Sequence, residues 1–204
     1  MEKETRSFLF EVRAEEDEEH GHYLIGRPIV YNSRTDLGWR DEIIASGALD
    51  KTDLKDVRFL VNHNTDMIPL ARSRNNNSNS TMQMIVDIEG MEIRVDLDIE
   101  NNAEARALYS AVKRGDISGM SFMFIVESDK WDDLESDHPL RTILSISKVF
   151  EVSAVTFPAY ESTSLEARSA EELESYKAAL ESARSEKRKA DEIKKKKIRL
   201  LLEV

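Results

Sequence analysis

The sequence contains no cysteine, only four prolines and seven glycines, and no long run of apolar residues. The absence of cysteine excludes disulfide scaffolds, thiol nucleophiles and cysteine-ligated zinc. The few prolines and glycines exclude collagen-like and linker-like chains. A membrane-spanning helix needs about 18 consecutive apolar residues, and the start Met1-Glu2-Lys3-Glu4 lacks the apolar stretch of a secretory signal. We therefore expect a soluble intracellular protein with no membrane partner.

Charge divides the 204 residues into two parts. Residues 1–165 hold 18 basic and 31 acidic groups, whereas residues 166–204 hold 11 basic and 9 acidic groups. The acidic first part repels nucleic acid phosphates, so no direct nucleic acid partner is expected. Lys187 to Arg199 places eight basic residues in thirteen positions, which suits either an acidic partner or a solvated helix. We predict a domain over 1–165 and a charged helical extension over 166–204.

The first part is expected to be mostly strands. Alternating or β-branched apolar segments are bounded by polar clusters, which is the pattern of strands and hairpins. The predicted strands are 8–13, 23–26, 29–31, 57–63, 82–88, 91–97, 120–126 and 143–157. Glu15 to Glu19 and Ser128 to His138 are predicted loops, and Pro28 predicts an edge position or a bulge.

Helical periodicity occurs in two places. Asn102 to Lys113 has apolar residues at helical spacing, with Asn101 or Asn102 as a cap and Gly115 at its end. From Leu165 onward the chain is rich in Ala, Glu, Lys and Arg, with apolar residues three and four apart. The order predicts a mainly antiparallel β body with one or two inserted helices, followed by the helical extension.

Only four histidines are present, and His63 has the most informative position. It ends an apolar predicted strand, where the two-residue period places it on the face of Phe59 and Val61. A lone histidine there is commonly a core residue, so its position alone does not predict catalysis. His20 and His22 flank Gly21 beside the acidic segment and are interpreted as turn or solvent-facing residues. No spaced His, Asp and Glu triplet accompanies them, so no metal site is predicted.

Two further residues stand out on apolar strands. Ser121 follows Gly119-Met120 and opens the segment with Phe122 and Phe124; it is either a nucleophile or a small residue filling a tight space. Glu151 interrupts an apolar strand. Because a buried charge needs a partner, Glu151 must reach solvent, pair with a cation or accept a bond from a group such as an imidazole.

These three residues together have the composition of a serine hydrolase site. Serine needs a base to remove its proton, and an imidazole base needs an acceptor on its other nitrogen. His63, Ser121 and Glu151 are 58 and 30 residues apart along the chain, so only a folded sheet can bring them together. A Gly-x-Ser-x-Gly elbow is absent, which argues against an α/β-hydrolase. With no glycine-rich phosphate loop, no cofactor is predicted.

Four segments in this order resemble the prohead maturation protease family of tailed bacteriophages. They are Phe59-Leu60-Val61-Asn62-His63-Asn64, Pro69-Leu70-Ala71-Arg72, Ile117-Ser118-Gly119-Met120-Ser121-Phe122 and the stretch from Phe150 to Ala159. Ser46-Gly47-Ala48-Leu49 also fits, and the resemblance extends from Phe8 to Arg168. That family is similar to the herpesvirus assemblins, so the resemblance implies an antiparallel β-barrel flanked by helices.

The resemblance also implies an activity and its residues. Ser121 would be the nucleophile, His63 the general base and acid, and Glu151 the orienting residue of a serine endopeptidase without metal or cofactor. Assemblins have a second histidine in the third position and an arginine pair shortly after it; this chain has Glu151 and Tyr160-Glu161 there. Such proteases act inside a procapsid in the host cytoplasm, cleave scaffolding protein or the scaffolding segment of the capsid protein, and then cut themselves. They resemble assemblins in depending on association, so a homodimer is expected.

The resemblance implies a role for the extension as well. A charged helix joined near Ser164 to Ser169 would tether the protease to scaffold or capsid and be removed on activation. The alternative from a different class is a non-catalytic scaffold or internal capsid protein, in which His63, Ser121 and Glu151 would lie apart and serve packing only.

Overall fold

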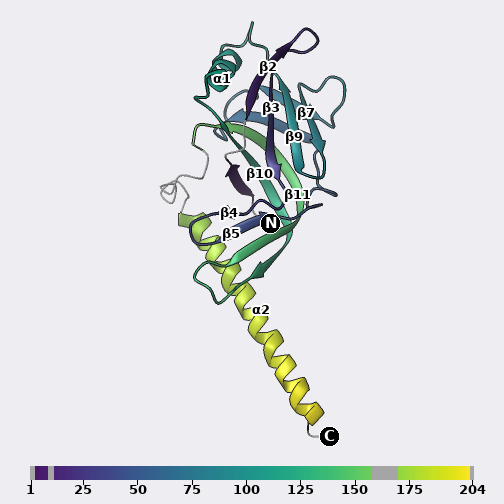
Figure 1. Cartoon of the computed structure of the whole chain (residues 1–204), viewed down its shortest axis with the longest axis vertical. Helices are drawn as coiled ribbons and strands as arrows, with labels where there is room; N and C mark the ends of the chain where they lie inside the picture. The colour runs from purple at the N-terminus through teal and green to yellow at the C-terminus, as the bar shows by residue number, and fades with distance from the viewer. Residues whose placement is uncertain (1–2, 9–11, 158–169, 203–204) are drawn as a thin grey trace.

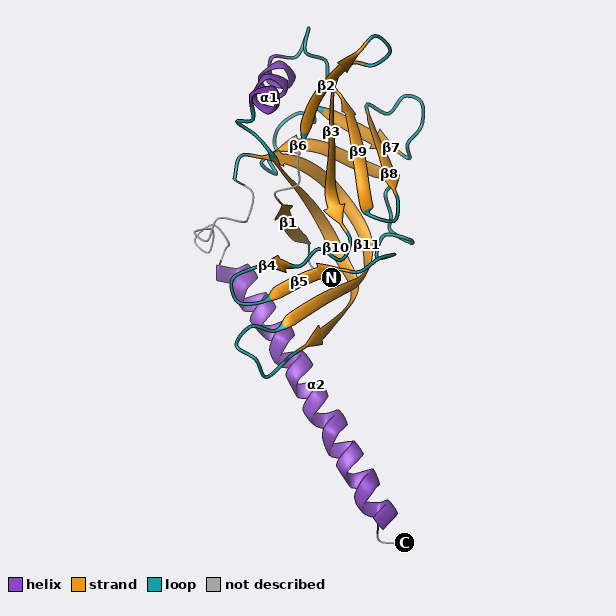
Figure 2. Cartoon of the chain, in the orientation of Figure 1, coloured by secondary structure: helices purple, strands orange, loops and turns teal. Residues whose placement is uncertain are grey.

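The computed structural model describes residues 3–8, 12–157 and 170–202. The expected domain boundary at 165–166, the expected strand end at Pro158 and the junction at 164–169 lie outside these residues. In the described part the chain forms eleven strands and two helices (Figure 1). The strands gather in one body, from which the second helix projects (Figure 2). The expectation of a mainly β protein is confirmed.

The strands form two sheets. The larger sheet follows the order β1-β10-β11-β5-β4, with β6 and β7 attached through β11, and the smaller follows β2-β3-β9-β8. The members of the larger sheet are β1 (Glu4–Phe8), β4 (Thr35–Asp36), β5 (Asp41–Ile44), β6 (Asp56–Val61), β7 (Ala71–Arg74), β10 (Gly119–Asp132) and β11 (Leu140–Val155). The members of the smaller sheet are β2 (Arg13–Asp17), β3 (Gly21–Val30), β8 (Met82–Val86) and β9 (Gly90–Asp96).

The expected antiparallel barrel is wrong for the described strands in two respects. The 16-residue strand β11 pairs in parallel with β5 at its start and with β6 near its end, so the larger sheet is mixed. The described ladders also leave β1, β4 and β7 with one strand neighbour each, so the larger sheet does not close on itself. Parallel partners require long crossovers, and the sequence pattern of a strand does not reveal the direction of its neighbour.

Several local expectations are confirmed and two are corrected. The helix α1 (Ala103–Arg114) begins after Asn102, whose side chain accepts from the amides of Glu104 and Ala105, and ends at Gly115 with φ 79°. The predicted hairpin is β8 and β9, and β3 has a register shift between Gly26 and Ile29 at the predicted bulge. The predicted acidic and polar loops are instead partly strand, because β2 includes Glu15 to Asp17 and β10 extends to Asp132.

One apolar core joins the two sheets and α1. Leu24 and Met91 from the smaller sheet, Phe122 and Val152 from the larger sheet, and Leu108 from α1 belong to the same buried cluster. Burying a side chain of this size contributes about 1.5–3 kcal/mol. The core therefore fixes β10 and β11, the two strands that carry Ser121 and Glu151.

The helix α2 (Ala170–Leu202) is 33 residues long, which corresponds to about 50 Å. Leu180 is buried and the Arg184 Nε donates to the carbonyl oxygen of Leu134 at 2.8 Å, so this part of α2 contacts the body. Residues 186–197 are all exposed, and the helix extends away from the sheets there (Figure 1). Among the described residues, neither helix has the length and apolar character needed to span a membrane.

Candidate functional site

His63 lies in a turn just beyond β6, and the expectation that it continues the strand is wrong. Asn62 and His63 have φ values of 50° and 57°, in the left-handed region that reverses the chain direction. The Asn62 amide donates to the carbonyl oxygen of Ala154 at 2.9 Å. Its side chain donates to Thr156 Oγ1 and accepts from the Thr156 amide, at 3.1 and 2.9 Å. The turn therefore holds His63 against the end of β11.

Glu151 reaches the imidazole of His63 from the neighbouring strand. The His63 Nδ1–H donates to Glu151 Oε1 over 2.6 Å, and the glutamate side chain is only 3% exposed. The parallel pairing of β6 with β11 brings these residues together across 88 positions of sequence. The sequence allowed Glu151 to reach solvent, pair with a cation or accept a bond from an imidazole, and the structure shows the bond from an imidazole. In a neutral imidazole, this contact favours the tautomer with the proton on Nδ1 and the lone pair on Nε2.

Ser153 completes this arrangement, and the sequence analysis did not single it out. Its hydroxyl donates to Glu151 Oε2 over 2.5 Å and accepts from the His63 amide over 3.1 Å. Ser153 is fully buried. The signal was available in the two-residue period of a strand, which places residues 151 and 153 on the same face.

Ser121 lies on β10, directly opposite Ser153 on β11 and Ser7 on β1. Residues that face each other across antiparallel strands point to the same side of the sheet. The three residues form a serine row across three neighbouring strands. The Ser7 hydroxyl donates to Ser121 Oγ at 2.8 Å, and the Ser121 hydroxyl donates to the carbonyl oxygen of Arg6 at 2.7 Å. The row places Ser121 one strand away from Glu151 and Ser153.

The reactive atoms of Ser121 and His63 are both buried in this structure. Ser121 is fully buried and its hydrogen bonds go to β1. Within the described residues, His63 Nε2 is buried and has no hydrogen-bond partner. Any reaction at these two atoms would therefore require local movement first. Catalytic hydrogen bonds commonly tighten only when substrate binds.

A cluster of buried charges anchors β1 beside the serine row. Glu42 on β5 accepts hydrogen bonds from Arg6, Arg40 and Arg141, and Arg6 and Arg141 also bond to Glu4. Burial by itself would raise the pKa of Glu42, but the three guanidinium groups outweigh burial and hold that pKa far below its ordinary range. The same balance of burial against Arg6 and Arg141 lowers the pKa of Glu4. The cluster fixes Arg6, whose carbonyl oxygen holds Ser121.

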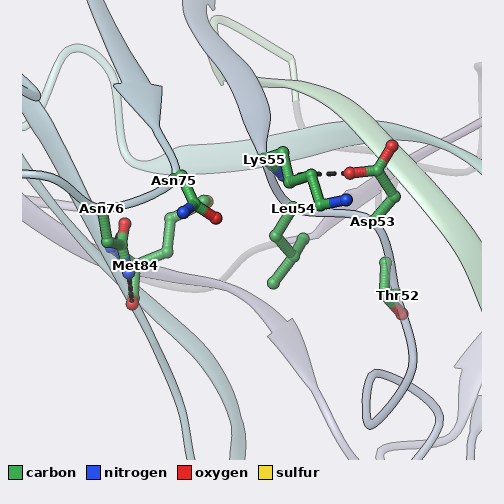
Figure 3. Close-up of a pocket in the computed structure, with 7 residues that line it drawn as sticks. All are labelled: Thr52, Asp53, Leu54, Lys55, Asn75, Asn76 and Met84. Carbon is green, nitrogen blue, oxygen red and sulfur yellow. Dashed lines mark hydrogen bonds between the residues drawn. The ribbon is translucent and has the colours of Figure 1, made fainter.

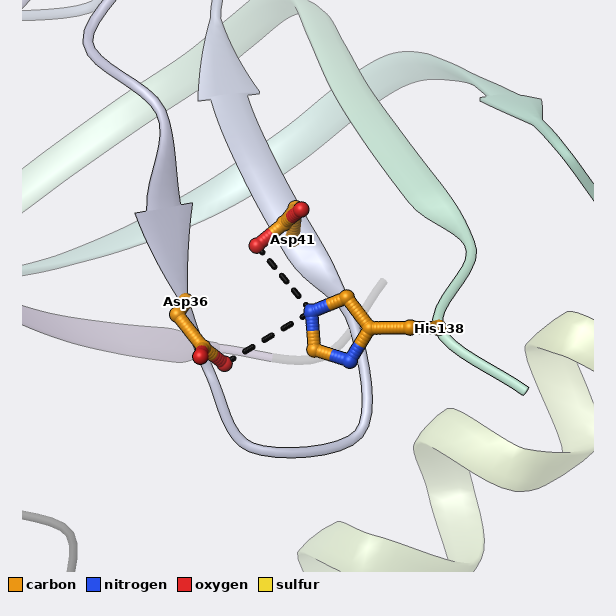
Figure 4. A group of neighbouring side chains, drawn as sticks. All are labelled: Asp36, Asp41 and His138. Carbon is orange, nitrogen blue, oxygen red and sulfur yellow. Dashed lines mark hydrogen bonds and ion pairs between the residues drawn. The ribbon is translucent and has the colours of Figure 1, made fainter. Parts of the chain in front are cut away.

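Asp36, Asp41 and His138 have ligand atoms within 4.8 Å of one another and form a candidate metal group (Figure 4). His138 Nε2 lies 3.1 Å from Asp41 Oδ1 and 3.6 Å from Asp36 Oδ1. Arg34 Nε also donates to Asp41 Oδ2, at 2.6 Å. Because a guanidinium already neutralises Asp41, we interpret the group as an ion-pair cluster that joins the loop before β11 to β4 and β5.

A pocket of about 240 Å³ lies beside the start of β6, whereas His63 follows the end of that strand. Figure 3 shows the residues that line it. It is lined by Thr52, Asp53, Leu54, Lys55, Asn75, Asn76 and Met84. Thr52 to Lys55 immediately precede β6, whereas His63 follows it. The pocket contains none of the candidate catalytic residues.

The comparison with protein families agrees with the resemblance seen in the sequence. No curated protein sequence matches the chain significantly. Among solved structures, the capsid assembly protease gp21 of bacteriophage T4 is similar at 12% identity and a TM-score of 0.38, over 76% of this chain and 99% of that chain. The family model described as caudovirus prohead serine protease matches residues 9–179, which is most of the chain and includes His63, Ser121 and Glu151. The chain therefore belongs to the caudovirus prohead serine protease family.

Proposed function

We propose that Ser121 is the nucleophile, His63 the general base and acid, and Glu151 the orienting carboxylate of this serine protease. The observation that carries the proposal is the 2.6 Å bond from His63 Nδ1 to Glu151, which leaves Nε2 as a lone-pair acceptor. The serine row supports it, because it puts Ser121 directly across from a residue that touches both His63 and Glu151. The alternative, in which the three residues lie apart and serve packing only, does not account for the bond between His63 and Glu151.

The proposed reaction uses the three residues in turn. The Ser121 hydroxyl turns from the Arg6 carbonyl oxygen, passes its proton to His63 Nε2 and attacks the carbonyl carbon of the peptide bond. The imidazolium is stabilised by Glu151 and gives its proton to the leaving amine. Water, deprotonated by the same Nε2, then attacks the acyl carbon, and the imidazolium returns this proton to Ser121 Oγ as the acyl group leaves it. Each step uses groups of this chain and water only.

The proposed substrates are the scaffolding protein or the scaffolding segment of the capsid protein, cleaved inside the procapsid in the host cytoplasm. Co-expression of the chain with its cognate scaffolding and capsid proteins tests this directly. Cleavage should occur with the wild type and be lost with Ser121→Ala and with His63→Ala. Replacement of Glu151 by Gln should lower kcat by about 10⁴. A loss of tenfold or less would reduce Glu151 to a structural residue.

We further propose that the extension over 166–204 tethers the protease and is removed by self-cleavage, and that the protease acts as a homodimer. Two features of α2 support this proposal. Arg184, near the middle of the helix, contacts Leu134 of the body, and residues 186–197 beyond it are exposed. Mass spectrometry of the purified wild type should show time-dependent loss of C-terminal residues, with Ser121→Ala intact. An unchanged mass in the wild type would contradict self-cleavage, and a monomer at working concentration would contradict the dimer.

A further inference from the structure

We propose that Ser153 is a positioning residue, whose single hydroxyl holds the Glu151 carboxylate and the His63 backbone at the same time. The proposal rests on the roles of His63 and Glu151 proposed above. It adds a fourth residue to the site, one that does not itself contact the substrate.

The first contact satisfies the buried carboxylate. Glu151 is 3% exposed, so its two oxygens depend on donors from the protein. Oε1 accepts from His63 and Oε2 accepts from Ser153, at 2.6 and 2.5 Å. Without the hydroxyl of Ser153, Oε2 would lose this bond and the carboxylate would be free to rotate. The acceptor that aligns the imidazole would then no longer be fixed.

The second contact holds the backbone of the base. His63 has φ 57°, in the left-handed region that is unfavourable for a residue with a side chain. Its amide donates to Ser153 Oγ at 3.1 Å, which helps to compensate for this cost. The bonds between Asn62 and Thr156 fix the preceding residue in the same way. Ser153 therefore determines the position of both partners in the His63–Glu151 pair.

The direction of these bonds separates Ser153 from a nucleophile. Its proton is directed to Glu151 Oε2, and its oxygen accepts from the His63 amide, so the hydroxyl does not face a base at Nε2. Among the described residues, the hydroxyl of Ser121, opposite it on β10, bonds to β1 and not to the His63–Glu151 pair. The two serines on neighbouring strands thus have different roles: Ser121 reacts with the substrate, and Ser153 positions His63 and Glu151.

The test compares Ser153→Thr with Ser153→Val, because these side chains have nearly the same shape and differ in the hydroxyl. Ser153→Ala serves as a third variant that adds no volume at this buried position. Ser145→Ala is the matched control, since Ser145 lies on the same strand and its hydroxyl pairs with that of Ser128 on β10, away from the candidate site. A fluorophosphonate probe reports the reactivity of Ser121 through its maximal labelling rate and its half-saturating concentration. Hydrogen exchange followed by NMR reports the His63 amide.

We expect Ser153→Ala and Ser153→Val to lower the maximal labelling rate about ten- to a hundredfold, the range for loss of a hydrogen bond to a charged group. The half-saturating probe concentration should stay the same, because Ser153 does not contact the probe. The His63 amide should exchange faster in both variants. Ser153→Thr should restore the rate to within about threefold of the wild type, and Ser145→Ala should behave as the wild type.

Three results would overturn the proposal. Equal rates for Ser153→Thr and Ser153→Val would show that only packing matters at this position. An unchanged His63 amide in Ser153→Ala would show that the backbone contact has no role. Labelling that survives Ser121→Ala and disappears in Ser153→Ala would make Ser153 the nucleophile. If the wild type takes up no probe, the proposed catalytic function fails, and the amide exchange still decides whether Ser153 positions His63.

Discussion

The buried charge cluster beside β1 makes a quantitative prediction for Glu42→Gln. Glu42 is 3% exposed and accepts from Arg6, Arg40 and Arg141. Glutamine keeps the volume but removes the charge, and its amide nitrogen adds a donor among groups that are already donors. Removal of one partner from a buried ion cluster costs about 3–5 kcal/mol. We expect the free energy of unfolding at pH 7 to fall by that amount.

The same variant should change how stability depends on pH. The pKa of Glu42 is depressed in the folded state, because the three arginines outweigh the opposing effect of burial. Its contribution to stability is therefore complete above the ordinary carboxyl pKa and is lost as the pH falls from there toward the folded pKa. Between pH 4.5 and pH 3 a depressed carboxyl loses about 1.4 kcal/mol per pH unit. The difference between wild type and Glu42→Gln should shrink by about 2 kcal/mol between pH 7 and pH 3.

Urea denaturation followed by circular dichroism at the two pH values measures both quantities. Glu92→Gln is the control, because Glu92 is 41% exposed and lies 3.5 Å from Arg27, so its loss should cost less than about 0.5 kcal/mol. If Glu42→Gln is as stable as this control at pH 7, or if its difference from wild type does not depend on pH, the buried cluster does not anchor β1 as described.

Three further predictions follow from single contacts. Ser7→Ala removes the hydroxyl that donates to Ser121 Oγ, and should raise the rate of fluorophosphonate labelling about two- to tenfold. A slower rate would show instead that Ser7 contributes to the reaction. Gly90 has φ 142°, and in Gly90→Ala the new Cβ would lie 2.0 Å from the carbonyl oxygen of Ile29. The variant should be less stable by more than about 2 kcal/mol in thermal unfolding. An unchanged melting temperature would refute the close approach. Asn102→Ala removes the cap of α1 and should cost about 1 kcal/mol; Asn102→Asp should recover most of the loss, and failure to do so would argue against capping.

Elements with local signals could be predicted from sequence. The helix α1 was predicted because Asn102 and Gly115 mark its ends, and the β8–β9 hairpin because its strands alternate around Gly90. The pairing of strands could not be predicted in this way. Strand β11 pairs with β6 in parallel, and nothing in either segment encodes the direction of the other.

The site was predictable in its residue types and less so in its geometry. His63, Ser121 and Glu151 were chosen because a base, a hydroxyl and an intruding carboxylate are unusual on apolar strands. The contact between His63 and Glu151 depends on the turn at Asn62 and on the parallel ladder, neither of which a two-residue period reveals. Ser153 could have been found from its spacing to Glu151. The cluster of Arg6, Glu42 and Arg141 could not, since its members are 36 and 99 residues apart.

The central claim is that one buried serine on β10 reacts with the help of an imidazole from the end of β6. Peptide mapping by mass spectrometry after fluorophosphonate treatment tests it most directly, with wild type and His63→Ala treated in parallel. The adduct is predicted on Ser121 in the wild type and at a strongly reduced level in the variant. An adduct on another serine, or one on Ser121 that forms equally fast without His63, would contradict the account.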